Sequence, residues 1–456
     1  MGATLTSYPV FSPIERRATF SIASLYAFRM LGLFMVLPVL AFSVVGYPDY
    51  SPLLLGLTLG AYGLVQAILQ IPLGLLSDRV GRRPVIIGGL LMFIFGSIVC
   101  AVVETMEGLI LGRALQGAGA IASTLMAMVT DLTSEENRTK AMAMIGGSIG
   151  FSFILAMVLG PLITLKYGLS GIFWMTAILG ALGVLIVLVL VPRRVEVQHN
   201  RETSTDLKQI VRLIKQTTLL RLNYGIFALH LALMAAFVAI PTILSDELGI
   251  EAQNLWWVYL LLLGGGFFIM LPGMIIAEKH NGQKWSFLVS VGAMMMATLA
   301  LSLYRGPIMT PVLLLIFFTA FNLLEASLPS WMSKSCPVGN RGTAMGIYST
   351  SQFLGAFFGG LLGGWSLQMF GVNGLFMVIS FILALWWLVC LGLKSPRPLK
   401  TLVLTVGELE HTDFTKIVSN IAGVEDILLL EGERLAYVQV DRLQVDMSSL
   451  QPYLNR

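Results

Sequence analysis

The sequence has few charged residues. Asp, Glu, Lys and Arg together make up 12% of its 456 residues, against about 25% in ordinary soluble domains. Hydrophobic residues make up 56%, and the mean hydropathy is +0.82. A soluble protein of this length cannot bury that much apolar surface. The composition therefore excludes a soluble globular protein and indicates an integral membrane protein.

Several kinds of site are also missing. With only three cysteines, two of them inside apolar runs, the sequence predicts no disulfide framework, redox pair or metal site. The dipeptide Gly-Lys is absent, and with it the phosphate-binding loop that an ATP-driven pump needs. No catalytic triad is present, and the net charge of +4 is too small and dispersed to indicate nucleic acid. We therefore expect neither an enzyme nor a resident cofactor.

Twelve segments are long and apolar enough to span a bilayer, which takes about 20 residues per helix. Lys and Arg accumulate on the cytoplasmic side of membrane proteins. With the N-terminus inside, 25 of the 29 basic residues fall on that side and two fall in outer loops. Both termini are therefore expected in the cytoplasm. The predicted spans are 18–41, 53–76, 84–103, 108–130, 141–164, 170–191, 222–245, 254–277, 285–303, 308–332, 343–368 and 373–393.

The hydropathy divides the membrane part into two halves of six predicted helices, residues 1–191 and 222–393. Residues 192–221 connect the halves. Within this connection, residues 206–215 are basic and amphipathic, and we expect them to lie as a helix on the inner membrane surface. The alternative is a plain polar linker.

After a proline-containing linker at 394–400, residues 401–456 have the charge density of a soluble domain. Their pattern predicts the order β-α-β-β-α, a ferredoxin-like arrangement that lacks its last strand. The segment has no CxxC pair, so a metal chaperone is not predicted. The predicted elements are 402–406, 413–421, 424–430, 435–440 and about 446–454.

A motif with fixed spacing stands between the second and third predicted helices. It resembles motif A of the major facilitator superfamily, and a degenerate copy with Gly273, Glu278 and Lys279 follows about 200 residues later, as expected of two six-helix halves. The resemblance implies that fold and a secondary transporter in a bacterial inner membrane. The motif residues are Gly74, Asp78, Arg79, Gly81, Arg82 and Arg83.

Further stretches are similar to those of twelve-helix drug:proton antiporters within that superfamily. Leu31-Gly32 is followed by Pro38-Val39, and Arg113-Ala-Leu-Gln-Gly-Ala-Gly-Ala resembles motif B. Gly147, Gly160 and Pro161 partly match motif C, but Ala156 replaces its middle glycine and Thr164-Leu165 its closing pair. The resemblance implies export, and this departure leaves import open.

Four ionisable residues lie inside predicted spans: Arg29, Arg113, His230 and Glu325. Insertion of an ionisable side chain into hydrocarbon costs about 2.5–3.5 kcal/mol, so a functional role is expected. The alternatives are an arginine that caps a neighbouring helix or snorkels to the interface, and a packed neutral histidine. In the superfamily their helices line the central cavity. Glu325 is the only deep acid, which makes it the expected proton carrier, with Arg113 as its neighbouring switch. Uncharged polar residues expected in the same cavity are Gln66, Gln70, Asn322 and Gln352.

Motif A is expected to act as a latch between the halves. The resemblance places Asp78 against the N-terminus of the eleventh helix, which begins near Arg341. Arg82 is expected to pair with Asp131 at the inner end of the fourth helix. The alternative is that Asp78 caps its own loop and the arginines only follow the charge bias of inner loops.

The sequence therefore predicts a proton-coupled exporter of small molecules that needs only the proton gradient. Its alternatives are a proton symporter that imports a small solute, with anions included, and a sensor derived from a transporter that acts through the C-terminal domain. We expect membrane lipids and a small-molecule substrate as partners and a monomeric transporter. The C-terminal domain is expected to contact the transporter core or a cytoplasmic protein.

Overall fold

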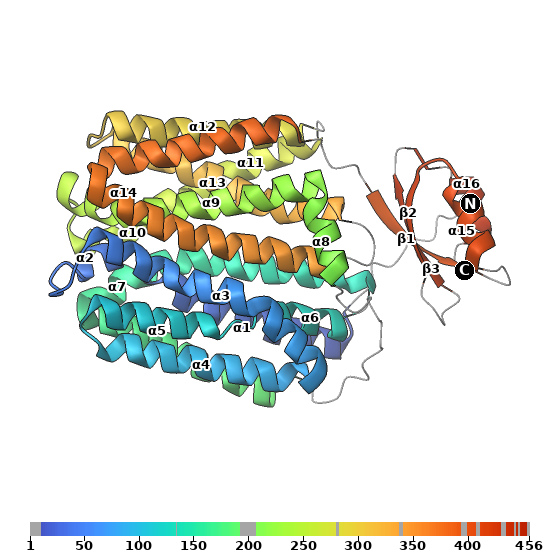
Figure 1. The fold of residues 1–456 in the computed structure, drawn as a ribbon, viewed down its shortest axis with the longest axis horizontal. Helices are drawn as coiled ribbons and strands as arrows, with labels where there is room; N and C mark the ends of the chain where they lie inside the picture. Colours follow the sequence, from blue (N-terminus) through green and yellow to red (C-terminus); the bar gives the residue numbers. More distant parts are fainter. Residues whose placement is uncertain are drawn as a thin grey trace.

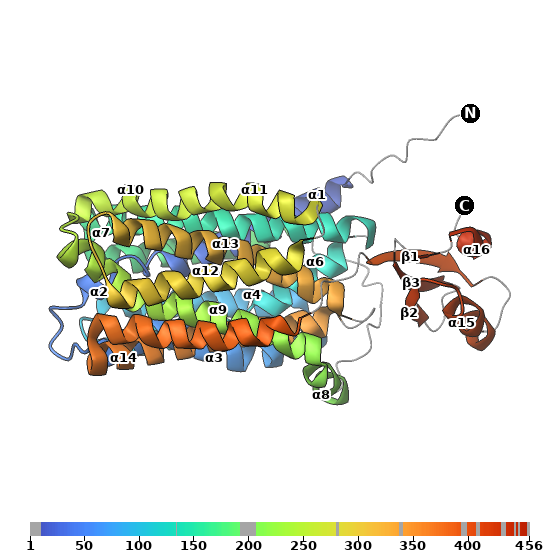
Figure 2. The ribbon, with the colours of Figure 1, turned by 90° about the horizontal axis from the view of Figure 1, so that it is seen from above.

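The computed structural model describes residues 11–133, 135–191, 207–279, 282–336, 341–393, 399–406, 411–429, 435–441, 444–445 and 447–453. Long helices run side by side in one bundle, and a small unit with a sheet lies beyond one end of it (Figure 1, Figure 2). The end of the bundle near this sheet also carries helix α8, and we call it the α8 end. The opposite end carries the short helix α2, and we call it the α2 end.

The first half of the bundle is built from seven helical segments. The first of them starts at a capping box in which Ser12 and Glu15 satisfy each other's backbone N–H groups, and proline follows Ser12. The last has 55 residues, but Gly168 has φ 64° and ψ −170°, so it consists of two helices joined at a glycine. The segments are α1 (Pro13–Phe34), α2 (Leu40–Ser43), α3 (Pro52–Val80), α4 (Arg82–Val102), α5 (Met106–Ala118), α6 (Ala122–Leu132) and α7 (Glu135–Val189).

The second half repeats this plan after α8 (Leu207–Lys215). Its last helix contains Gly371 with φ 66° and ψ −170°, about 200 residues after Gly168, and is divided in the same way. Two π-helices, Ile243–Glu247 and Leu260–Gly264, flank a short α10. The α-helices are α9 (Thr217–Thr242), α10 (Leu255–Tyr259), α11 (Gly265–Lys279), α12 (Gln283–Leu303), α13 (Met309–Ser335) and α14 (Arg341–Leu391).

Within the described residues, nine helical segments are long and apolar enough to cross a membrane by length and composition. The prediction of a helical polytopic protein is thus confirmed. Two of the nine, 140–189 and 342–391, have 50 residues each, and each contains the glycine that divides it into two helices. The sequence did not reveal that one left-handed glycine joins these helix pairs where a loop was expected.

Three predicted spans are wrong as continuous α-helices. The first ends at Phe34 because Pro38 lacks the N–H that would continue it, and α2 follows after a turn. The fourth breaks between α5 and α6, where a Cβ atom on Gly119 would lie 2.4 Å from the Gly89 carbonyl oxygen, so the chain is pressed against α4. The eighth contains a π-helix that ends in the run Gly264-Gly265-Gly266, where helix propensity is low.

Basic side chains cap the same helix end in both halves. Arg17 and Arg83 donate to carbonyl groups in the last turns of α7 at 2.8 and 2.7 Å. About 200 residues later, Arg221 and Lys284 donate to carbonyl groups at the end of α14. These carbonyls have no partner within their own helices. The repeat predicted from motif A and its degenerate copy therefore extends to the capping contacts.

Glycines let α14 pack against both α3 and α9. A Cβ atom on Gly360 would lie 2.3 Å from the carbonyl oxygen of Gly56 in α3. One on Gly359 would lie 2.4 Å from the carbonyl oxygen of Leu231 in α9. A real side chain could not fit at such distances, so only glycine at these positions allows the helices to approach this closely.

The contact between the halves is concentrated toward the α2 end. Along α3 and α14 it runs from Gly364, which meets the Pro52 carbonyl, to Gly63, which meets the Phe353 carbonyl. Nearer the α8 end, a Cβ atom on Gly346 of α14 would meet nothing within 4 Å. The close glycine contacts between α3 and α14 therefore lie toward the α2 end.

A loop carboxylate positions α5 at the α2 end. Asp49 accepts the backbone N–H of Met106 at 2.9 and 3.0 Å and that of Glu107 at 3.3 Å. These N–H groups begin α5, where a negative charge is favoured. The hydrogen bond from Met106 holds the pKa of the Asp49 carboxyl below its ordinary value.

The C-terminal unit has the element order predicted from the sequence. Its three-stranded sheet has the order β1-β3-β2, with β3 antiparallel to both neighbours. Leu404, Phe414 and Val438 are fully buried in its own core. The last helix ends earlier than predicted, at Leu450, because Pro452 follows. The elements are β1 (Leu399–Thr405), α15 (His411–Ser419), β2 (Val424–Leu429), β3 (Leu435–Asp441) and α16 (Met447–Leu450).

The predicted amphipathic helix is observed as α8. Leu213 is buried against the bundle, while Arg212 and Lys215 are exposed. Its position on a membrane surface and the boundaries of the predicted domains stay predictions.

Candidate functional site

Three helices of the second half bring His230, Glu325 and Gln352 together. Nε2 of Gln352 in α14 lies 2.8 Å from Nε2 of His230 in α9, and it donates to Oε1 of Glu325 in α13 at 3.4 Å. Nδ1 of His230 lies 3.8 Å from Oε2 of Glu325. The Glu325 side chain is 35% exposed while that of His230 is only 8% exposed. The acid therefore has a buried polar partner and a side chain that is partly exposed, although its Oε2 atom is buried.

Tyr348 belongs near this cluster and was not found from the sequence. It lies one turn before Gln352 in α14 and is 4% exposed. Its buried hydroxyl has no hydrogen bond among the described residues, and it is close enough to Glu325 for the charge of the carboxylate to act on it. The sequence signal that could have found Tyr348 is its i, i+4 spacing from Gln352, which places both residues on one face of the helix.

Asn322 contacts a different element. Its amide nitrogen donates to the carbonyl oxygen of Leu263 at 3.3 Å, inside the π-helix that follows α10. Such helix irregularities often occur at functional sites. Asn322 therefore links α13 to the irregular part of the eighth predicted span, one turn from Glu325.

A second polar cluster lies in the first half. Nη2 of Arg29 in α1 donates to the hydroxyl of Tyr62 at 2.6 Å and to Oε1 of Gln66, both in α3. Arg113 in α5 donates through Nη1 to Gln116 at 2.8 Å, and its guanidinium carbon lies 5.3 Å from the centre of the Tyr62 ring. Gln66 donates onward to Gln70 at 3.2 Å. Tyr62 was not singled out from the sequence, because its largely apolar ring does not stand out in a membrane span.

The structure does not bring Arg113 next to Glu325. In the described part of the chain, the contacts of Arg113 are all in the first half, with Thr58, Tyr62 and Gln116. Those of Glu325 are in the second half, with His230 and Gln352. The sequence assigns each residue to a helix but does not show which way the side chain points across the two halves.

Motif A forms a tight turn with an ion-pair network at the α8 end. Gly81 joins α3 to α4 with φ 94°, a conformation that favours glycine. Nε of Arg82 lies 3.0 Å from Oδ2 of Asp131, so the predicted pair is present. Arg82 also pairs with Asp78 and donates to Ser77 at 2.7 Å.

Asp78 is 52% exposed, and Arg82 is its partner among the described contacts. The side chain of Arg341 lies outside the described residues, so the contact expected at the start of α14 stays a prediction. Arg79 is exposed at the end of α3, and a Cβ atom on Gly74 would lie 3.0 Å from Ser123 of the same half.

The residues that resemble motif C lie along the first part of α7. A Cβ atom on Gly160 would lie 2.4 Å from the carbonyl oxygen of Met35, so α7 packs closely on the turn between α1 and α2. Pro161 is buried beside it, whereas Gly147 is exposed and a Cβ there would meet nothing within 4 Å. Gly160 therefore has a packing role in this structure.

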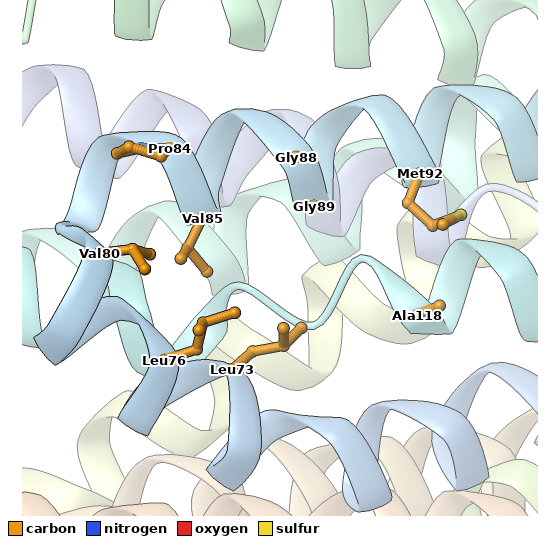
Figure 3. Close-up of a pocket in the computed structure, with 9 residues that line it drawn as sticks. All are labelled: Leu73, Leu76, Val80, Pro84, Val85, Gly88, Gly89, Met92 and Ala118. Carbon is orange, nitrogen blue, oxygen red and sulfur yellow. The ribbon is translucent and has the colours of Figure 1, made fainter.

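An apolar groove of about 330 Å³ lies between α3 and α4, apart from both polar clusters (Figure 3). Its lining offers aliphatic side chains and glycine backbone, so it provides no charge for proton or ion chemistry. The lining residues are Leu73, Leu76, Val80, Pro84, Val85, Gly88, Gly89, Met92 and Ala118.

The sequence model described as Major Facilitator Superfamily matches residues 22–360 and 225–420. The Inner membrane transport protein YajR of Escherichia coli (strain K12) is 43% identical over 433 residues, 94% of this chain and 95% of that protein. The Uncharacterized transporter BU466 of Buchnera aphidicola subsp. Acyrthosiphon pisum is 36% identical over 348 residues, 76% of this chain and 89% of that protein.

Solved structures show the same fold at low sequence identity. The human organic anion transporter MFSD10 matches with a TM-score of 0.64 and 18% identity over 83% of this chain and all of that chain. A bacterial homolog of the human lysosomal transporter Spinster, inward-facing and occupied, matches with a TM-score of 0.68 and 14% identity over 84% of this chain and 97% of that chain. The chain belongs to the major facilitator superfamily: it is a multi-pass membrane transporter, not an enzyme, and is closely related to YajR.

Proposed function

We propose that this chain is a proton-coupled secondary transporter that exports small molecules, drug-like compounds or metabolites, across a bacterial inner membrane by alternating access. The observation that carries the proposal is the position of Glu325, an acid with a partly exposed side chain inside the helix bundle and in contact with His230 and Gln352. An ionisable group at such a place is costly unless it has a function.

Proton binding at Glu325 would change the contacts between three helices. The ionised carboxylate accepts from Gln352 and faces His230, whereas the protonated form is neutral and becomes a donor. A ligand shifts a conformational equilibrium when it binds the two states with different affinity. A proton that alters the packing of α9, α13 and α14 meets this condition.

We further infer twelve membrane spans with both termini in the cytoplasm. The nine apolar segments become eleven once Gly168 and Gly371 divide two of them, and α1 completes the set. The α8 end, where motif A, α8 and the C-terminal sheet lie, is then the cytoplasmic end (Figure 1). The bias of Lys and Arg toward these segments supports this orientation. In this arrangement the close contacts between α3 and α14 lie toward the outer side.

Proton coupling can be tested once a substrate is known. Growth of a strain that overproduces the protein and of a strain that lacks it, across a panel of toxins and metabolites, identifies the substrate. The purified full chain in proteoliposomes is then assayed for proton movement with a pH-sensitive dye in the lumen.

Movement of protons in the direction opposite to the substrate supports export by antiport. Movement of protons together with the substrate would replace export by import through symport, which the motif C departure at Ala156 leaves open. Active transport without any proton movement would contradict coupling.

We propose that the ferredoxin-like C-terminal unit regulates or helps to assemble the transporter and does not carry substrate. Its own core of Leu404, Phe414 and Val438 supports a separate fold. A chain that ends at residue 398 is expected to insert into the membrane and to transport within a few-fold of the full chain, measured in the same proteoliposomes. A truncated protein that inserts and folds but transports nothing would make the unit part of the transport mechanism.

A further inference from the structure

Two buried arginines in the first half carry charge that the described residues do not neutralise. Arg29 and Arg113 are each 1% exposed. Among the ion pairs of the described chain, neither guanidinium group has a carboxylate partner. Both lie within 6 Å of the centre of the same ring, that of Tyr62, at 5.8 and 5.3 Å. Two positive charges are therefore held beside one aromatic side chain.

The hydrogen bonds of the two groups are also incomplete. Arg29 uses Nη2 for Tyr62 and Gln66, while its Nε and Nη1 have no partner. Arg113 uses Nε for the Thr58 carbonyl at 3.4 Å and Nη1 for Gln116, while its Nη2 has none. Buried polar atoms are normally satisfied. The polar neighbours orient both guanidinium groups but leave three nitrogen atoms available for an acceptor.

The alternative is that the arginines only crosslink helices. Neutral residues would make such links without the cost of two uncompensated buried charges. The planar guanidinium fork matches carboxylate, sulfonate and phosphate groups, and two such forks suit an anion better than a neutral or cationic group.

The site can open when the halves move. The ring of Tyr62 lies 6.1 Å from that of Phe353 in α14, at the last close contact between α3 and α14. A movement of the halves that separates α3 from α14 at this point would remove Phe353 from Tyr62 and open the surroundings of the two arginines. This step rests on the alternating access proposed above.

We propose that Arg29 and Arg113 bind the anionic group of the transported molecule, so that the substrate is an organic anion with a carboxylate, sulfonate or phosphate group. Tyr62 lies beside both cations and contacts Phe353 of α14. Glu325, the one acid of the candidate cavity, lies in the other half and does not occupy the site.

The test uses the purified full chain in nanodiscs and thermal unfolding as the readout of binding. The anionic probes are benzoate, benzenesulfonate and phenyl phosphate. Neutral benzyl alcohol and cationic benzylamine, which are of similar size, serve as comparison probes. We expect the anions to raise the unfolding temperature of the wild-type protein more than the neutral or cationic probe. Arg29→Gln and Arg113→Gln should each weaken the apparent affinity for the anions about 10-fold or more, because each removes charged hydrogen bonds.

Two controls separate the outcomes. Arg305→Gln removes the same charge from an outer loop, where Arg305 pairs with Glu247, and should bind the anions as the wild type does. Glu325→Gln should also retain anion binding. Loss of proton coupling together with intact anion binding in this variant would support both the anion site and the role of Glu325. Intact proton coupling in Glu325→Gln would overturn only the role of Glu325.

The anion site is wrong if the neutral or cationic probe stabilises the wild-type protein as much as the anions do. It is also wrong if both glutamine variants bind the anions with unchanged affinity. Should a glutamine variant fail to fold, Arg29→Lys or Arg113→Lys takes its place; lysine keeps the charge but lacks the planar fork, so it should also bind the anions more weakly than the wild type does.

Discussion

In the Glu325→Gln variant, substrate-driven proton movement is expected to fall about 10-fold or more, a coupling loss within the usual range between two binding sites. Glutamine has nearly the same shape and can still contact Gln352 and His230, but it cannot bind and release a proton. The transport that remains should no longer depend on pH. Transport rates in proteoliposomes across a pH series measure both effects.

The matched control is Glu107→Gln, which changes an exposed glutamate at the start of α5. It should leave both the rate and the pH profile as in the wild type. An unchanged pH profile at full rate in Glu325→Gln would remove Glu325 from the mechanism.

Asp78→Asn is expected to shift the population toward the inward-open state and to slow transport about 2- to 5-fold, which corresponds to one carboxylate at a helix N-terminus. In the structure Asp78 is half exposed, and Arg82 keeps Asp131 and Ser77 when Asp78 is lost. Removal of the charge therefore costs little in this state. It costs more in a state where Asp78 meets the start of α14.

Distances between spin labels on Leu190 and Lys334, at the α8 ends of the two halves, measure this shift by double electron–electron resonance. Both residues are exposed, and the three native cysteines are buried and can be replaced. Asp246→Asn, an exposed acid near the α2 end, serves as the control and should leave the distances unchanged. If the distributions of Asp78→Asn and wild type coincide, motif A is only a charged loop and not a latch.

Hydropathy predicted most of the membrane helices because each needs a long apolar run, but it did not show how they are joined. Gly168 and Gly371 join helix pairs through one residue with positive φ, and a window of average hydropathy cannot distinguish this from a loop. The break at Gly119 depends on the approach of Gly89 from another helix, which no local pattern contains. The C-terminal elements were predictable because their strands and helices differ in period and are separated by turns.

For the site, the sequence predicted the Arg82–Asp131 pair because the motif fixes which helix ends meet. It did not predict the partners of Arg113, because helix number does not give the rotation of a helix about its axis. Tyr62 and Tyr348 were not singled out, because the aromatic ring of tyrosine is largely apolar and does not interrupt an apolar span. Their hydroxyl groups become conspicuous once burial places them next to Arg29 and Glu325.

The central claim is that a proton on Glu325 changes the balance between two arrangements of the halves. The most direct test follows the Leu190–Lys334 spin-label distance in nanodiscs across an acidic to alkaline pH series, without substrate, in wild type and in Glu325→Gln. The account predicts a distribution that changes with pH in the wild-type protein and stays constant in Glu325→Gln. A distribution that shifts equally in both proteins, or in neither, would contradict it.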